Sequence, residues 1–170
     1  GSPNTVVTGT APAAPQSHTF NTAGTFNVKL YVKNAAGCLS AIKDTNIVVI
    51  AKPVVDFQTP PGICLGGSMQ FTNLTTPTTG VTYLWNFNDP NATVPNPNTS
   101  TVKDPLHIYT STGPFNVSLT VTLNGYGCAD TKTKALSSTI YQLPTAVITA
   151  PATACLRDST VFSSTSSTGG

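Results

Sequence analysis

Two histidines, His18 and His107, are the residues best suited to proton transfer, because an imidazole changes charge near neutral pH. They stand 89 residues apart, and each lies two residues before an aromatic side chain, Phe20 or Tyr109. Neither has a Ser or Cys nearby in the sequence that suggests a catalytic triad, although sequence distance alone does not exclude one. We therefore predict that both histidines pack beside the aromatic residue and that the chain is not an enzyme.

The loop at 86–105 carries the side chains that could bind a metal. Its candidate ligands are Asn88, Asp89 and Asp104, and Ca²⁺ takes six to eight oxygen ligands of this kind. Only two carboxylates are present, however, and the ligand spacing of an EF-hand is absent. Because Asn and Asp also bond their own backbone in turns, we predict a turn-forming loop and no cofactor, with calcium as the weaker alternative.

Four cysteines form the third set of reactive residues. They are Cys38, Cys64, Cys128 and Cys155. None shows the C-x₂-C spacing of a zinc site, so structural disulfides in an oxidising compartment are the better interpretation.

The composition indicates an all-β exported protein. Only 8% of the residues are charged, against roughly 25% in an average soluble protein. The chain has 30 Thr and 14 Ser but no Glu, which favours strands over helices. The net charge of +2 comes without a basic cluster, so we predict no nucleic-acid partner. No apolar run approaches the roughly 18 residues needed to span a bilayer, so we predict no membrane insertion in this stretch.

The elements that would position these residues occur in repeated copies. Aligning His18 with His107 also aligns 26–28 with 115–117, and a small shift aligns Cys64 with Cys155. The period is about 90 residues, which indicates a tandem array of whole domains. We predict the C-terminal part of one repeat at 1–51, a complete repeat at 52–142 and the N-terminal part of the next at 143–170. A half-repeat should expose an apolar face and unpaired strand edges.

Alternating apolar residues mark the strands. In 115–123 every second residue is apolar, as in a half-buried strand, and 26–32 repeats the pattern. Trp85 and Phe87 share one face of a further strand, with Tyr83 and Leu84 predicted on the other. Trp85 is expected in a core between two sheets, with a sugar-stacking surface as the alternative. Further strands are predicted at 54–59, 68–74, 82–88, 107–110, 130–136, 145–149 and 159–164.

The complete repeat resembles the PKD domain, an immunoglobulin-like β-sandwich. The family pattern is roughly WDFGDG followed, after a variable loop, by NPxHxYxxxGxYxVxLxV. The first part is matched by Trp85, Phe87 and Asp89, with departures at Asn86, Asn88 and Pro90. The second part is matched by His107, Tyr109, Gly113, Phe115, Val117, Leu119 and Val121. The resemblance implies tandem sandwiches with core aromatics at Trp85, Phe87, Tyr109 and Phe115.

The resemblance also suggests a cellular setting. Similar PKD domains form arrays in very large secreted and surface proteins of the Bacteroidota, often as cargo of the type IX secretion system. The usual roles of the family are spacing, adhesion and protein contact. This implies a secreted or cell-surface protein whose partners are neighbouring repeats, with a surface polysaccharide or protein as a further ligand.

A sandwich constrains how the cysteines pair. Cys64 precedes the second strand and Cys128 follows the sixth, so they should lie at opposite poles, about 30 Å apart. A disulfide needs Cα atoms within about 7 Å. We therefore favour disulfides between neighbouring repeats, with a Cys64–Cys128 bridge inside one repeat as the alternative.

Three functions remain open at this point. The favoured one is a non-catalytic rod-like stalk, filament or adhesin body on the cell surface, because the connection at 48–57 leaves almost no free linker. The second is an accessory module of a secreted polysaccharide- or protein-degrading enzyme. The third is a polymer subunit in which a half-repeat of one chain completes that of the next.

Overall fold

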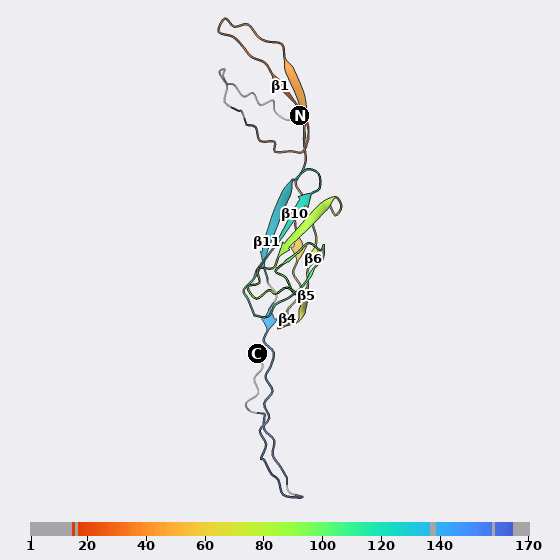
Figure 1. Cartoon of the computed structure of the whole chain (residues 1–170), viewed down its shortest axis with the longest axis vertical. Helices are drawn as coiled ribbons and strands as arrows, with labels where there is room; N and C mark the ends of the chain where they lie inside the picture. The colour runs from red at the N-terminus through yellow and green to blue at the C-terminus, as the bar shows by residue number, and fades with distance from the viewer. Residues whose placement is uncertain (1–14, 16, 137–138, 158, 165–170) are drawn as a thin grey trace. The chain divides into compact units, whose positions relative to one another are not determined.

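The structure is a computed structural model that describes residue 15 and residues 17–136, 139–157 and 159–164 (Figure 1). These residues form strands, turns and irregular segments, and the fold class is all-β as predicted. Over these same residues, no helix is long and apolar enough to cross a membrane. The chain divides into two compact units, Gly1–Ala51 and Lys52–Gly170.

The first unit contains one antiparallel hairpin, made of β1 (Gly24–Leu30) and β2 (Lys43–Val49). Its register pairs Val28 with Thr45 and Leu30 with Lys43. Its apolar side chains are largely exposed, and Leu30 retains 64% of its accessible surface. The hairpin therefore presents an apolar strand without a second layer to cover it among the described residues of this unit.

A four-stranded sheet forms the larger layer of the second unit. Its order is β11–β10–β7–β8, and all the neighbours are antiparallel. The bounds are Val81–Asn86 for β7, Thr99–Ser100 for β8, Asn116–Leu123 for β10 and Ala129–Ala135 for β11. The alternating apolar residues of β10 face the core, as predicted: Val117, Leu119 and Val121 are fully buried.

Shorter strands make the opposing layer, in which β3 pairs with β6 and β5 with β9, both antiparallel. β4 and β12 form a separate two-stranded sheet and run parallel. The bounds are Phe57–Gln58 for β3, Ile63–Cys64 for β4, Ser68–Gln70 for β5, Thr72–Asn73 for β6, Leu106–Ile108 for β9 and Ile140–Tyr141 for β12. β5 and β6 together cover most of the strand predicted at 68–74. The two layers form the predicted immunoglobulin-like sandwich.

The core between the layers is centred on Trp85. Its ring is fully buried and lies 5.1 Å from the ring of Phe57 and 5.8 Å from that of Phe71, both on the opposing layer. Its indole N–H donates to the carbonyl of Val102 at 3.0 Å, so the one polar atom of the ring is satisfied. Phe87, Tyr109 and Phe115 are buried as well.

Three sequence predictions need correction here. Tyr83 shares the face of Trp85 and packs against the core, because residues two apart in a strand point the same way. Leu84 alone takes the outer face, with half of its surface exposed. Segments 145–149 and 159–164 do not form strands, and an isolated bridge joins Thr149 to Ser163. We attribute this to exposed apolar side chains with no opposing layer to cover them among the described residues, because a two-stranded ladder is marginal in water on its own.

The end segments nevertheless keep the register of the complete sandwich. Pairs Val28–Thr45 and Leu30–Lys43 of β1–β2 shift by 89 residues onto pairs Val117–Lys134 and Leu119–Lys132 of β10–β11. The Thr149–Ser163 bridge shifts by 91 residues onto the Gln58–Thr72 pair of β3–β6. The same strand pairing thus recurs in segments whose apolar side chains are far less buried. Phe162 is 64% exposed, for example, while its counterpart Phe71 is fully buried.

We predict that Trp85→Ala lowers the free energy of unfolding of the full chain by about 3–5 kcal/mol, the range for large aromatic truncations in cores. Urea denaturation followed by circular dichroism measures the change. The matched control is Tyr126→Ala, whose side chain is 66% exposed in a turn, with an expected change within about 0.5 kcal/mol. A loss below about 1 kcal/mol for Trp85→Ala, accompanied by loss of glycan binding, would contradict a core role.

Candidate functional site

The most buried polar group of the sandwich is a pair of side chains, Asp89 and His107. His107 lies on β9, and Asp89 follows β7 at the start of the 86–105 loop. Nε2 of His107 lies 3.0 Å from Oδ2 of Asp89, and both side chains are at least 99% buried. The imidazole stacks on Phe87 with centroids 4.2 Å apart and meets the edge of Tyr109 at 4.6 Å. The pair is thus enclosed by aromatic rings, where an unpaired charge would be costly.

The pair holds the 86–105 loop against β9. Oδ1 of Asp89 accepts the N–H of Asn91 at 2.9 Å, and the N–H of Asp89 donates to the side-chain oxygen of Asn98 at 2.7 Å. Asn96 bonds both backbone groups of Ile108, donating at 2.6 Å and accepting at 3.2 Å. Side-chain amides and one carboxylate therefore supplement the short β7–β8 pairing in this loop.

Burial sets the protonation of this site. It lowers the pKa of His107 below its usual 6.5, and the Asp89 carboxylate, followed by the Pro97 carbonyl, offsets only part of that effect. Nδ1 of His107 makes no hydrogen bond within the described part of the chain, which fits a neutral imidazole that donates Nε2–H to Asp89. Burial also raises the pKa of Tyr109, whose hydroxyl donates to the carbonyl of Phe87 at 2.9 Å.

The geometry of the Asp89–His107 pair suits a structural role rather than catalysis. His107 is 1% exposed, so a substrate in solvent cannot reach its imidazole. Its ring also packs at the edge of Tyr109, the aromatic residue two positions later. His18 makes the same kind of edge contact with Phe20 at 4.7 Å, but it is exposed and belongs to the other unit. The sequence pointed to the aromatic neighbour in each case and missed Asp89 as the partner of His107.

The three calcium candidates are committed to separate bonds. Asp89 uses both oxygens as described above, and Asp104 accepts the backbone N–H of Asn73 at 2.7 Å. Asn88 has a positive φ of 53°, as expected of an Asn in a tight turn, and its N–H donates to the side chain of Asn86 at 2.8 Å. Within the described ranges, no group of three or more His, Cys, Asp or Glu residues is placed to hold a metal.

The four cysteines are all free thiols in the structure. Cys64 lies on β4, in register with Tyr141 of β12, and is exposed. Cys128 lies in the turn after β10, where its carbonyl accepts the N–H of Leu123 at 2.8 Å. No disulfide joins Cys64 to Cys128 in the structure, and pairing with other repeats stays a prediction because those partners would lie outside this chain.

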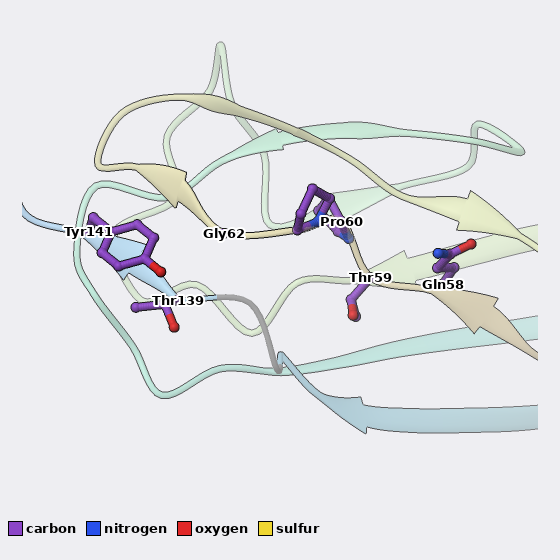
Figure 2. Close-up of a pocket in the computed structure, with 7 residues that line it drawn as sticks. Gln58, Thr59, Pro60, Gly62, Thr139 and Tyr141 are labelled. Atoms are coloured by element: carbon purple, nitrogen blue, oxygen red, sulfur yellow. The ribbon is translucent and has the colours of Figure 1, made fainter.

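An open hollow of about 410 Å³ lies between residues 58–62 and residues 139–141 (Figure 2). Its walls carry the amide of Gln58, the hydroxyls of Thr59 and Thr139, the ring of Pro60 and the 54% exposed ring of Tyr141. Among the described residues that line it, none carries a charge. Its chemistry suits a neutral polar ligand rather than an ion.

Comparison with known families accounts for the sandwich and its aromatic motif. Residues 50–140 match the family model described as PKD domain. The chain belongs to the PKD domain family. A comparison with curated protein sequences gives no match. PKD domains are typically non-catalytic, immunoglobulin-like and extracellular, which agrees with a buried pair of side chains that fixes a loop.

We predict that stability falls as the pH drops from about 7 to about 5, because of His107. Its folded pKa is depressed, so the unfolded chain takes up the proton first and unfolding becomes easier as the pH falls through this range. His107→Gln keeps a donor for Asp89 but does not titrate. Urea denaturation of the full chain at pH 7.5 and pH 5 should show the loss of stability in the wild type and a smaller loss in His107→Gln.

The control is His18→Gln, in the other unit, which should keep the wild-type dependence on pH. An unchanged pH dependence in His107→Gln would show that another group carries it.

Proposed function

We propose that this chain is a non-catalytic stretch of a secreted or cell-surface protein in which PKD domains follow one another as a stiff spacer. The single observation that carries the proposal is the repeated register. β1–β2 pairs as β10–β11 does, and the Thr149–Ser163 bridge pairs as β3–β6 does. Two partial copies around a complete domain are what a stretch of a tandem array would contain.

The biological setting follows from the resemblance and the composition. A surface rich in Thr and Ser with 8% charged residues suits an exported protein. We extend the proposal to a stalk, filament or adhesin body in a bacterium of the Bacteroidota type, exported by a type IX system. Immunolabelling of intact cells of the source organism with antibodies to residues 52–142 tests it. Surface labelling is expected, and labelling seen only after lysis would contradict an external location.

The cysteines add a proposal about how neighbouring repeats are held. Cys64 pairs in register with Tyr141, which directly precedes the segment that leads into the next repeat. Cys128 lies in a turn anchored to Gly80 by the N–H of Asn124 at 2.8 Å. We propose that the cysteine before strand two of one repeat bonds to the sixth-strand-turn cysteine of the next.

We predict that non-reducing peptide mapping of a chain with three whole repeats shows this linkage between neighbours. The physical reason is the separation of the two poles, about 30 Å against the roughly 7 Å that a disulfide spans. The reduced sample serves as the control, because the linked peptide should disappear from it. A Cys64–Cys128 peptide from an isolated 52–142 domain would contradict the arrangement.

The hollow at 58–62 and 139–141 favours a second candidate function, that of an accessory module which holds a neutral polysaccharide for a secreted enzyme. An exposed aromatic ring beside amide and hydroxyl groups is suited to sugar rings. Pull-down of the full chain on insoluble polysaccharides, with Tyr141→Ala as the variant and Tyr126→Ala as the control, discriminates the two. Retention that is lost only in Tyr141→Ala supports the accessory role, and no retention supports the spacer alone.

A further inference from the structure

β9 pairs with β5 along one edge, and among the described residues no strand pairs with its other edge. In an antiparallel pair, alternate residues direct their backbone N–H and C=O groups toward the partner strand and away from it. Ile108 directs both groups away from β5, because both bond to a residue outside the pair. Leu106, two residues earlier, therefore presents its backbone groups on the same side. An edge of this kind can accept a strand from another chain.

The side chain of Asn96 bonds both backbone groups of Ile108. Its Nδ2 donates to the carbonyl of Ile108 at 2.6 Å, and its Oδ1 accepts the N–H of Ile108 at 3.2 Å. The side-chain amide of an Asn carries the same acceptor and donor as a peptide unit. The two bonds therefore reproduce those that one residue of an adjacent antiparallel strand would make. Asn96 thus takes the place that an added strand would occupy beside Ile108.

The chain around Asn96 holds its side chain in this place. The N–H of Asn96 donates to the carbonyl of Thr93 at 3.1 Å, and its carbonyl accepts the N–H of Thr93 at 3.1 Å. These bonds close a tight turn over Val94 and Pro95. Pro95 and Pro97 flank Asn96 and restrict the backbone on both sides. Because the side chain is positioned in advance, little conformational entropy is lost when it makes the two bonds.

The two edges of the four-stranded sheet are protected in ways that β9 lacks. β11, at one edge, carries Asp130, Lys132 and Lys134, and charged side chains discourage the addition of a strand. β8, at the opposite edge, has only two residues. The outward side chains of β9 are Leu106 and Ile108, which are uncharged and are 61% and 36% exposed. Without Asn96, this edge would offer backbone groups beside apolar side chains.

We infer that Asn96 caps the edge of β9 and prevents it from pairing with β9 of a second copy of this chain. Two copies of one strand can pair antiparallel about a two-fold axis, so the same residues would supply both sides of the contact. The cap does not depend on the proposed spacer function, because it acts between any two copies of the domain in solution.

Asn96→Ala in the full chain removes both bonds and tests the cap. Native-state hydrogen exchange of a dilute sample should show the amide of Ile108 exchanging about tenfold faster than in the wild type, as expected for the loss of one hydrogen bond. Sedimentation equilibrium should show self-association at a concentration about tenfold lower than in the wild type, because main-chain bonds supply affinity when a strand is added to an edge. Asn96→Ser, whose shorter hydroxyl cannot bond both groups, should change both values in the same direction and replaces Asn96→Ala if that variant does not fold.

The matched control is Asn91→Ala, in the same loop. Nδ2 of Asn91 donates to Oγ of Ser111, outside β9, at 3.2 Å. Its loss should change both the exchange of Ile108 and the self-association by less than about twofold. A second control adds Leu106→Lys to Asn96→Ala and so places a charge on the open edge, as β11 does. Self-association should then return to the wild-type level while the amide of Ile108 remains fast.

Four results would overturn the inference. The first is unchanged exchange at Ile108 in Asn96→Ala, and the second is faster exchange without stronger self-association. The third is self-association that persists after Leu106→Lys is added, because the contact between copies would then lie elsewhere. The fourth is an equal effect of Asn91→Ala, which would show that the loop had only been loosened.

Discussion

The packing of Phe57 and Phe71 against Trp85 is the interaction on which the rest of the sandwich depends. It joins the opposing layer to the four-stranded sheet through a residue that is fully buried. The chain has one tryptophan, and its strand, β7, pairs with both β10 and β8. Where no such strand is present among the described residues, as in the segments at 17–51 and 143–157, counterparts of core residues such as Leu30 and Ile148 remain exposed although the register is kept.

The Asp89–His107 pair is as deeply buried as Trp85, and it holds the 86–105 loop, which hydrophobic packing does not hold. The 86–105 loop has few apolar residues and little regular pairing, so it needs directed bonds to hold one conformation. The Asp89–His107 pair, Asn96 and Asn98 supply them. A chain with 8% charged residues thus places one carboxylate inside the domain, where every bond to it is made by the loop or by β9. We interpret this site as one that fixes the conformation of the 86–105 loop rather than as a reaction centre.

Much of the fold could be predicted because strand alternation is a local signal. The period-two pattern of 115–123 identified β10, and the aromatic motif placed Trp85 in a core. Short strands such as β4, β8 and β12 carry only two residues each and have no period to detect. For Asp89 the sequence predicted a place in a turn-forming loop, with calcium as the weaker alternative, because sequence shows its oxygen atoms and not their partners. The contact between Asp89 and His107 depends on β9 lying beside the 86–105 loop, which is a feature of the tertiary structure that sequence does not show.

The central claim of this account is that a buried core around Trp85 makes residues 52–142 stable, whereas the described end segments hold their register without such a core. Native-state hydrogen exchange of the full chain tests it most directly, since protection reports the free energy of opening at each amide. We predict that the amides of Val117 and Leu119 in β10 exchange only on global unfolding, and that those of their counterparts in β1, Val28 and Leu30, exchange orders of magnitude faster. Protection in β1 equal to that in β10 would contradict the claim.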